Sequence, residues 1–261
     1  MRILLEKRAF CPLFLYRPAQ TVWTQILEDH MQIAVISDLH LGTGGATDEF
    51  GHEDNEFLKF LDFLEGNFEK VVLLGDIWET LTAPSPARQF EQLKKAQLNH
   101  AEISQRFLRP KYQYIHGNHD LVAQRFGVPA EHTIQADGVR LLFSHGHQGD
   151  GLCSTARPVS ELAIWLGAWI RRLGLGWVYH HLAKIERLRT TNHGDCRVRR
   201  WALQEAEERS VDVVVTGHTH VPVCDESGNT LFLNSGTCAQ GALSFLSLDT
   251  GRGEYRVNFG F

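Results

Sequence analysis

The 261-residue sequence has no long apolar segment, no internal repeat and no low-complexity tract. A membrane-spanning helix needs about 20 consecutive apolar residues, whereas the apolar run that begins at Leu162 ends at Arg171 and Arg172. Charged residues interrupt the first ten positions, and a secretory signal has a continuous apolar region there. We therefore expect a cytoplasmic protein without a membrane span.

Cysteine is sparse and shows no pairing pattern. The chain has five cysteines and no C-x-x-C pair, which disfavours a disulfide framework and indicates reduced thiols. No Pro-, Gly- or Ser-rich linker divides the chain, so we expect one domain over residues 31–261 and an extension over residues 1–30. The formal net charge of -5 disfavours bulk nucleic-acid binding, and no stable nucleic-acid complex is expected.

Short β-branched or aromatic runs alternate with helical patterns in the first half of the chain. Apolar residues at Phe57, Phe60, Leu61 and Leu64 have helical spacing, and residues 87–108 are rich in helix formers. Strand repetition of this kind predicts an α/β fold in which sites gather beyond the carboxyl ends of the strands. The runs that predict strands are residues 32–37, 70–74, 112–115, 139–143 and 211–215.

A polar cluster follows each predicted strand. Taken singly, each cluster is also typical of a turn, because Asp, Asn and Gly are favoured there. Taken together, their carboxylates, imidazoles and amide are ligands of first-row divalent metals, in sufficient number for two ions. This predicts hydrolysis of a phosphate ester. The clusters are Asp38-Leu39-His40, Gly75-Asp76, Gly117-Asn118-His119-Asp120, His145-Gly146-His147 and Gly217-His218-Thr219-His220.

In this order the clusters resemble the calcineurin-like metallophosphoesterases, whose pattern is D-x-H, G-D, G-N-H-D/E, H and G-H-x-H. Asn234-Ser235-Gly236-Thr237 is similar to the closing turn of that family. Segments 37–42 and 75–78, with the long insert before the last cluster, resemble the UDP-2,3-diacylglucosamine hydrolase branch most. Two residues depart from that branch. His147 stands where the branch usually has the Asp of H-G-D, and His119 stands where its best-known members have Arg.

The resemblance implies a four-layer α/β/β/α sandwich with an inserted helical cap. We expect residues 230–233, 243–246 and 255–257 to supply the second sheet. The resemblance also implies two divalent metal ions, Mn²⁺ first and Fe or Zn as alternatives. One ion would be held by Asp38, His40 and His220, the other by Asn118, His145 and His218, with Asp76 between them.

A catalytic role for His119 accompanies the same resemblance, whereas the candidate substrate contacts follow from the chemistry of the side chains. His119 would donate a proton or hydrogen bond to the phosphoryl or leaving oxygen, with Asp120 orienting its ring. His147 has three alternative roles, as a ligand in place of His145, as a hydrogen-bond partner of a ligand, or as a phosphate contact. Candidate phosphate contacts, with simple exposure as the alternative for each, are Arg157, Arg197 and Arg199.

The insert over residues 151–192 is where specificity is expected. An apolar stripe through Trp165 and Trp169 predicts one amphipathic helix, and residues 178–188 predict a second. Residues 157–200 hold nine Lys and Arg against three Asp and Glu. A basic, Trp-rich cap suits an anionic ligand with an apolar part, or peripheral contact with an anionic inner membrane surface. The alternative is a hairpin packed on its own core.

We therefore predict a metal-dependent phosphoric ester hydrolase that cleaves a phosphodiester or pyrophosphate bond. The substrate would be a phosphate-containing small molecule or a lipid-linked nucleotide such as UDP-2,3-diacylglucosamine. The alternatives are a nuclease, a cyclic-nucleotide phosphodiesterase, or a phosphomonoesterase acting on proteins or small molecules. A catalytically inactive binding scaffold is disfavoured, because loss of function would be expected to erase at least one ligand.

Overall fold

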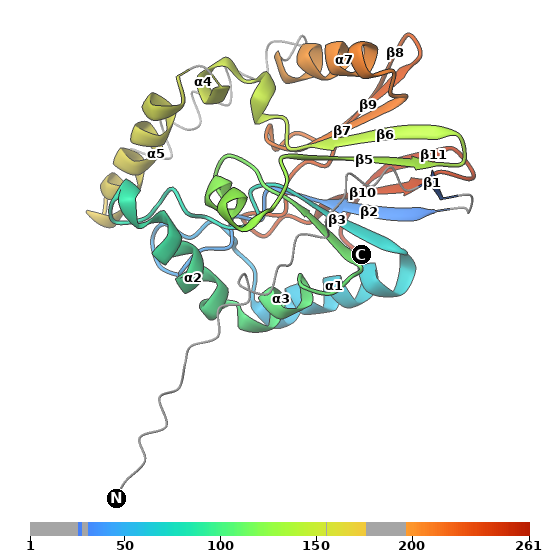
Figure 1. The fold of residues 1–261 in the computed structure, drawn as a ribbon. Helices are drawn as coiled ribbons and strands as arrows, with labels where there is room; N and C mark the ends of the chain where they lie inside the picture. Colours follow the sequence, from blue (N-terminus) through green and yellow to red (C-terminus); the bar gives the residue numbers. More distant parts are fainter. Residues whose placement is uncertain (1–25, 28–30, 155, 176–196) are drawn as a thin grey trace, which may run out of the picture.

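The structure of the protein is a computed structural model that describes residues 26–27, 31–154, 156–175 and 197–261. Two β-sheets stack on each other, and helices cover both outer faces (Figure 1). Helices α1 (Asp54–Asn67), α2 (Gln89–Asn99) and α3 (Ala101–Arg106) lie on one side, and α7 (Arg197–Arg209) lies on the other. This confirms the predicted four-layer α/β/β/α sandwich.

The first sheet has five strands in the order β11-β10-β2-β3-β4. Its parallel centre consists of β2 (Gln32–Ile36), β3 (Lys70–Leu74) and β4 (Tyr112–Ile115). These strands alternate in sequence with α1 and with α2 and α3, as the strand and helix patterns predict. Their carboxyl ends therefore lie at one edge of the sheet.

The second sheet has six strands in the order β1-β5-β6-β7-β9-β8. Strands β6, β7 and β9 are mutually parallel, so β6 and β7 also end side by side. The bounds are β1 Ile26–Leu27, β5 Glu131–Ala136, β6 Val139–Ser144, β7 Val213–Thr216, β8 Val223–Ser227 and β9 Thr230–Asn234.

The prediction that all three late runs build the second sheet is wrong for two of them. Only β9 lies there, whereas β10 (Ser244–Asp249) and β11 (Glu254–Phe259) extend the first sheet through antiparallel pairing of β10 with β2. The reason lies in β10, whose Phe245 packs in the core beneath α1 while Leu246 and Leu248 pack between the sheets. A strand that is apolar on both faces suits an inner position in a covered sheet.

Strand β2 divides its side chains between two cores, as the two-residue period of a strand requires. Ile33 and Val35 pack between the two sheets, and Ala34 and Ile36 pack against the helix layer. The predicted apolar face of α1 is buried in that layer. The predicted helix over residues 87–108 is divided into α2 and α3 at His100, whose Nδ1 lies 2.7 Å from Asp54 Oδ1.

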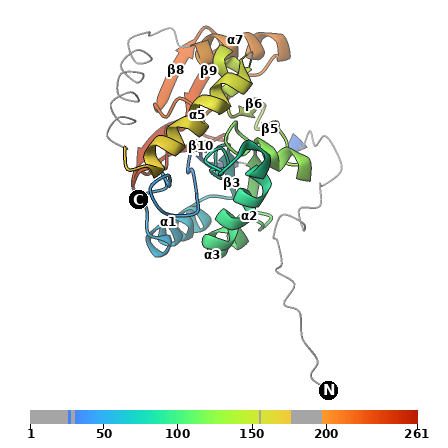
Figure 2. The same ribbon diagram turned by 90° about the vertical axis from the view of Figure 1, so that its left-hand side faces the viewer.

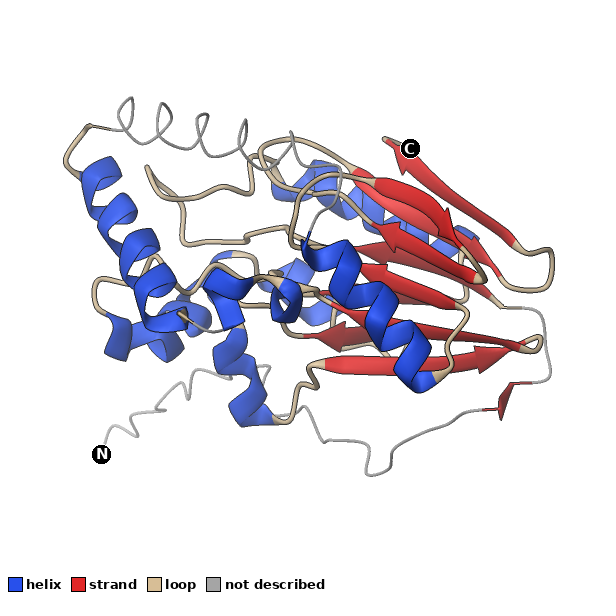
Figure 3. Cartoon of the chain, turned by 90° about the horizontal axis from the view of Figure 1, so that it is seen from above, coloured by secondary structure: helices blue, strands red, loops and turns tan. Residues whose placement is uncertain are grey.

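The insert contributes α4 (Gly151–Ser154) and α5 (Arg157–Arg172), which confirms the first of its two predicted helices. The second, over residues 178–188, lies outside the described residues, as does nearly all of the predicted extension. Helix α5 stands beyond the carboxyl ends of the parallel strands (Figures 1 and 3) and crosses in front of them when viewed from that end (Figure 2). None of the helices that the structure describes is long and apolar enough to traverse a bilayer.

Three short 3₁₀ helices complete the loops around that end of the sheets. They are η2 (Pro86–Arg88), η3 (Leu121–Phe126) and η4 (His147–Gly149).

Two loops hold α5 in place, because Arg171 pairs with Glu49 and donates from Nε to Ala46 O at 2.9 Å. Arg172 also donates to Thr82 O. The first described helix of the insert is therefore tied to the loops that follow β2 and β3.

Candidate metal centre

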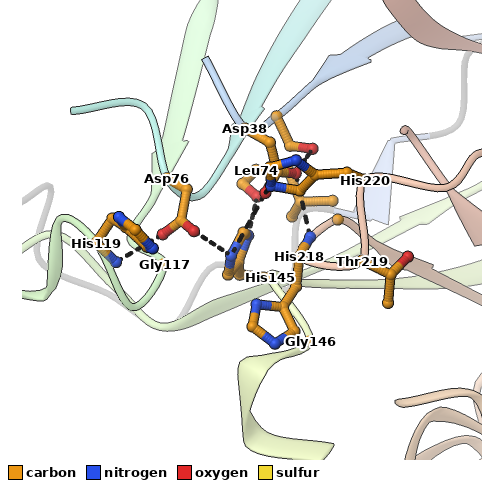
Figure 4. Close-up of polar contacts among 12 residues, drawn as sticks. Asp38, Leu74, Asp76, Gly117, His119, His145, Gly146, His218, Thr219 and His220 are labelled. Carbon is orange, nitrogen blue, oxygen red and sulfur yellow. Dashed lines mark hydrogen bonds and ion pairs between the residues drawn. The ribbon is translucent and has the colours of Figure 1, made fainter. Parts of the chain in front are cut away.

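The five predicted clusters meet at one place, because the strands that precede them end at the same edge of the sandwich. Figure 4 shows the carboxylates Asp38 and Asp76 facing the imidazoles of His145 and His220 across the gap between the two sheets. The clusters after β2, β3 and β4 approach from the five-stranded sheet, and those after β6 and β7 from the six-stranded sheet. The fold thus assembles ligands that lie far apart in sequence, such as Asp38 and His218, which are separated by 180 residues.

One group of potential metal ligands consists of Asp38, His40 and His220, whose ligand atoms all lie within 4.8 Å of one another. Asp38 Oδ1 lies 3.1 Å from His220 Nε2, and the Nε2 atoms of His40 and His220 lie 3.4 Å apart. Asp38 and His40 are buried. A carboxylate oxygen between two imidazole nitrogens forms a donor set that suits a divalent cation.

A second group consists of Asp76, His145 and His218. His145 Nε2 lies 3.1 Å from Asp76 Oδ2 and 3.9 Å from Asp38 Oδ1, so it also adjoins the first group. Asp76 and His145 are buried. The two groups therefore form one continuous array of carboxylates and imidazoles rather than two isolated sites.

Unsatisfied polar atoms gather at this array. A buried polar atom without a partner costs about 1–3 kcal/mol, so such atoms are rare unless something binds them. Three belong to the predicted ligands Asp38, Asn118 and His145. Among the described residues, the buried side-chain atoms without a hydrogen bond are Asp38 Oδ1, Asn118 Oδ1, His145 Nε2, His147 Nδ1 and His116 Nε2. The donors present fit divalent metal ions.

The backbone is also strained at several of the predicted ligands. Eight described non-glycine residues have a positive φ, and five of them are predicted ligands. Each left-handed residue costs roughly 1–2 kcal/mol, and such strain persists where the fold uses it to place functional groups. The five ligands are Asp38 (φ 52°), His40 (φ 49°), Asp76 (φ 51°), His218 (φ 67°) and His220 (φ 58°).

The glycine of G-N-H-D is required by close packing beneath the centre. A Cβ atom at Gly117 would lie 2.2 Å from Asp76 Oδ1 and 2.7 Å from His145 Cδ2. Any side chain would therefore displace a ligand from each of the two sheets. This contact explains why Gly117 directly precedes the ligand residues in the cluster after β4.

Hydrogen bonds fix which nitrogen of each imidazole faces the centre. His145 Nδ1 lies 2.8 Å from Leu74 O, and His40 Nδ1 lies 3.2 Å from Glu79 Oε2. His218 Nε2 lies 3.1 Å from Asp150 Oδ2. Partners of this kind orient metal-binding imidazoles and set their tautomer. Nε2 of His40 and His145 and Nδ1 of His218 are therefore the nitrogens available to metal.

The charges of the array keep its acids ionised. Burial alone would raise the pKa of Asp76, but His145 and His119 lower it well below its ordinary value. In the same way His220 and His145 outweigh burial and lower the pKa of Asp38. Burial would lower the pKa of His145, yet Asp76 and Asp38 raise it to about 9. The carboxylates are thus anionic and attract cations at neutral pH.

Glu79 is a site residue that the sequence analysis missed. Its side chain is almost fully buried, and Oε2 lies 2.7 Å from His119 Nδ1 as well as 3.2 Å from His40 Nδ1. Its other oxygen accepts from the backbone N–H groups of Leu81 and Thr82. The available signal was an acid three residues after Asp76, on the same loop.

The prediction that Asp120 orients the ring of His119 is therefore wrong. Asp120 is fully buried and instead accepts from Gly117 N at 2.6 Å, Ile77 N at 2.8 Å and the Tyr114 hydroxyl at 2.6 Å. Its carboxylate joins the loops after β3 and β4, because these donors lie on or beside both loops. Asp120 thus supports the backbone of the centre, and Glu79 holds the imidazole.

His147 lies among other imidazoles at the edge of the centre. Its ring centroid lies 5.6 Å from that of His145 and 6.4 Å from that of His218. Burial and the neighbouring His145 lower its pKa to about 3, so the ring is neutral. Of the three predicted roles, the geometry is compatible with a contact to a ligand or to a phosphate beside the centre.

The three candidate arginines lie in different settings. Arg199 pairs with Asp225 on β8, with Nη2 2.5 Å from Oδ2. Arg197 is exposed at the start of α7, and a Cβ on Gly151 would lie 3.3 Å from its Nη1. Gly151 adjoins Asp150, which contacts His218, so Arg197 lies near the rim of the centre. The side chain of Arg157 lies outside the described part of the structure.

The sequence pattern described as the calcineurin-like phosphoesterase superfamily domain matches residues 31–164 and 179–251. The chain belongs to this superfamily. With the ligand groups described above, this phosphoesterase binds divalent metal and hydrolyses phosphoric esters. The predicted enzyme class and superfamily are thereby confirmed.

Curated relatives confirm the predicted resemblance to one branch of the superfamily. The phosphoesterase is 27% identical over 224 residues to UDP-2,3-diacylglucosamine hydrolase of Shewanella halifaxensis (strain HAW-EB4), covering 76% of this chain and 86% of the relative. It is 24% identical over 216 residues to the protein of the same name from Shewanella pealeana (strain ATCC 700345 / ANG-SQ1), covering 74% and 83%. Among solved structures, Vps29 of Chaetomium thermophilum aligns with a TM-score of 0.46 at 17% identity, covering 88% of this chain and 94% of that protein.

Proposed function

We propose that this phosphoesterase uses two metal ions to cleave a phosphodiester or pyrophosphate bond in a lipid-linked nucleotide of the UDP-2,3-diacylglucosamine type. The observation that carries the proposal is the continuous array of two ligand groups, in which His145 Nε2 lies within 4 Å of carboxylates from both groups. The choice of substrate is supported by the curated relatives, which are UDP-2,3-diacylglucosamine hydrolases.

In this proposal Asp38, His40 and His220 hold one ion, and Asn118, His145 and His218 hold the other. Asp76 lies between them, and its Oδ1 atom accepts a hydrogen bond from His119 N at 2.7 Å. Oxygen and imidazole donors suit Mn²⁺, which we take as the first choice, with Fe and Zn as alternatives. When bound, the ions supply a water of lowered pKa and neutralise charge on the phosphoryl oxygens.

His119 serves as the proton donor to the leaving oxygen. Burial would lower its pKa, but Glu79 and Asp76 raise it to about 10, so the imidazolium form is available at neutral pH. Glu79 occupies Nδ1, which leaves Nε2 to donate. An acid held in one orientation contributes to catalysis because no reorientation precedes proton transfer.

Helix α5 supplies an apolar surface for the lipid portion. Apolar residues at three- and four-residue spacing along α5, and Leu173 directly after it, are 40–70% exposed: Val159 (63%), Leu162 (51%), Leu166 (48%), Trp169 (40%) and Leu173 (70%). Helix α5, which carries this stripe, lies beyond the strand ends that carry the centre (Figure 1). We infer that it contacts acyl chains at the inner surface of a membrane, where a cytoplasmic enzyme would meet a lipid-linked substrate.

The first experiment separates an enzyme from a binding scaffold. Purified protein loaded with Mn²⁺ is assayed on bis-p-nitrophenyl phosphate, and its bound metal is measured. Asp76→Ala removes the carboxylate between the two groups, and we expect the rate to fall about 1,000-fold. Fewer than two ions per chain at saturation, together with no turnover, would exclude the proposed mechanism.

The second experiment selects the substrate. Rates are compared on UDP-2,3-diacylglucosamine, a cyclic nucleotide, single-stranded DNA and p-nitrophenyl phosphate. Trp169→Glu places a charge on the exposed stripe of α5. It should therefore slow cleavage of the lipid substrate and leave the rate on p-nitrophenyl phosphate unchanged. Leu98→Glu, at an exposed apolar residue of α2, is the matched control for the same added negative charge. Equal loss on both substrates in Trp169→Glu would contradict a lipid-binding stripe.

A further inference from the structure

Beside the binuclear centre, a third set of metal-binding side chains includes a sulfur atom. The potential ligand atoms of Asp150, Cys153 and His218 all lie within 4.8 Å of one another. Asp150 Oδ2 and His218 Nε2 are 3.1 Å apart. Asp150 follows η4 and Cys153 lies on α4, so one short segment brings both residues to His218. This nitrogen of His218 is the one that the proposed binuclear centre does not use.

The dimensions of this set approach those of a tetrahedral zinc site. Zinc binds sulfur at about 2.3 Å and nitrogen or oxygen at about 2.0–2.2 Å, which separates its ligands by roughly 3.3–3.6 Å. The observed oxygen–nitrogen separation of 3.1 Å is close to that spacing, and Cys153 Sγ lies within 4.8 Å of both other ligand atoms. Three protein ligands and one water form a coordination that zinc commonly adopts.

The three residues are also accessible, and their chemistry differs from that of the main centre. Each is only partly buried. The proposed ligands of the binuclear centre are oxygen and nitrogen donors, whereas Cys153 adds a thiol. Thiolate ligands favour zinc and cobalt over manganese. A thiophilic ion can therefore distinguish this set from the array that suits Mn²⁺.

We propose that Asp150, Cys153 and His218 form a separate binding site for Zn²⁺ or another thiophilic divalent ion, and that its occupation inhibits the enzyme. Binding forms one bond each to Cys153 Sγ, His218 Nε2 and an Asp150 oxygen. The thiol proton and the proton on Nε2 pass to solvent, and no group is oxidised or reduced. Inhibition follows because His218 is shared with the binuclear centre. The inhibition therefore rests on the proposed function, whereas metal binding at this site does not depend on it.

The thiol is the element that makes this site separately visible. Burial and the neighbouring Asp150 raise the pKa of Cys153 to about 12, so without metal the thiol is protonated. A bound cobalt ion would convert it to a thiolate and produce a sulfur-to-cobalt charge-transfer band in the near ultraviolet. Cobalt at the binuclear centre, which has no sulfur ligand, produces no such band.

The test is a Co²⁺ titration of the full-length protein, with absorbance as the readout. We expect the band to reach, at saturation, the intensity of one thiolate–cobalt bond per chain in the wild type and to be absent in Cys153→Ser. Serine keeps a hydroxyl beside Asp150, so the support of His218 is retained. Cys224→Ser, at an exposed thiol on β8, is the matched control and should keep the band. A band that persists in Cys153→Ser, or that requires Cys224, would overturn the proposal.

Inhibition is measured separately on the Mn²⁺-loaded enzyme. Cys153→Ser should keep the wild-type rate with Mn²⁺ and require at least about ten times more Zn²⁺ for half inhibition, since loss of one ligand costs on the order of 1.4 kcal/mol or more. Equal zinc sensitivity in both proteins would exclude inhibition through this site. Absence of all phosphoesterase activity would instead count against the proposed function, and the cobalt band would still test the site.

Discussion

On the side of the five-stranded sheet, His119 lies 2.7 Å from the buried carboxylate of Glu79, and its pKa is raised to about 10. On the side of the six-stranded sheet, His147 lies among imidazoles, its Nδ1 has no hydrogen bond, and its pKa is lowered to about 3. Burial lowers the pKa of both rings, and the neighbouring carboxylates outweigh burial only at His119. One side of the centre is therefore arranged to give a proton and the other to remain neutral.

Replacing the two imidazoles tests this difference most directly. His119→Ala removes the proton donor, and we expect kcat to fall about 100- to 10,000-fold. His147→Ala removes a neutral ring beside the centre and should lower kcat far less. Both variants are assayed on bis-p-nitrophenyl phosphate with Mn²⁺, and their metal content is checked. A larger effect of His147→Ala would reverse the proposed roles of the two sides.

Glu79→Gln is expected to have the next largest effect, because one carboxylate supports both His40 and His119. Loss of a hydrogen-bond partner behind a metal ligand typically weakens metal affinity about 10- to 100-fold. The same change removes negative charge beside His119 and lowers the pKa of its ring. Because the acid acts when protonated, activity is lost as pH rises through that pKa.

The measurements for Glu79→Gln are a metal-binding titration and a pH profile of kcat at saturating metal. The alkaline limb should move to lower pH, whereas Asp120→Asn leaves the contact of Glu79 with His119 in place and serves as the control for damage to the adjacent loops. An unchanged alkaline limb in Glu79→Gln would show that Glu79 does not govern the proton donor.

Acid stability should distinguish His147 from its neighbour His145. Its pKa falls from 6.5 in the unfolded chain to about 3 in the folded protein, so the unfolded state binds the extra proton between these values. The resulting stability is present above pH 6.5 and is lost as pH falls toward 3. The raised pKa of His145 has the opposite sign, since its contribution is present below 6.5 and is lost as pH rises toward about 9.

In metal-free protein, His147→Gln should therefore reduce the fall in Tm between pH 7 and pH 4. Glutamine retains a polar side chain but takes up no proton in that range. The melting curves are recorded in the presence of a chelator, so that metal release does not contribute. If wild type and variant lose the same number of degrees, the neutral state of His147 makes no contribution to acid sensitivity.

The strands and the groups of potential metal ligands were predictable because both depend on local sequence. Short apolar runs specify buried strands, and the ligands follow them directly at strand ends such as Asp38 and His145. Glu79 was not predictable in its role, because its contacts with His40 and His119 depend on how two loops meet. The same applies to Asp150 and Cys153, which reach His218 only through the path of the segment after β6.

Two errors in the prediction of the fold have a related origin. Strand β10 could not be assigned to a sheet from its own sequence, because either sheet offers apolar partners and only its pairing with β2 selects one. Helix α7 was not recognised, because its buried face consists of Val198, Ala202 and Ala206 within a strongly charged sequence. Small side chains at helical spacing give a weak pattern, although they allow close packing on β7 and β9.

The smallest expected effect separates two neighbouring arginines on the side of the six-stranded sheet. Arg199 pairs with Asp225 on β8, and a partly exposed pair of this kind contributes about 0–1 kcal/mol to stability. Arg199→Ala should thus lower Tm slightly and leave KM unchanged. Arg197 lies near Gly151 at the rim of the centre, so Arg197→Ala should raise KM for a phosphate ester about two- to fivefold. If the two variants change KM equally, neither guanidinium contacts the phosphate, and substrate recognition on this side depends on His147 or on the insert.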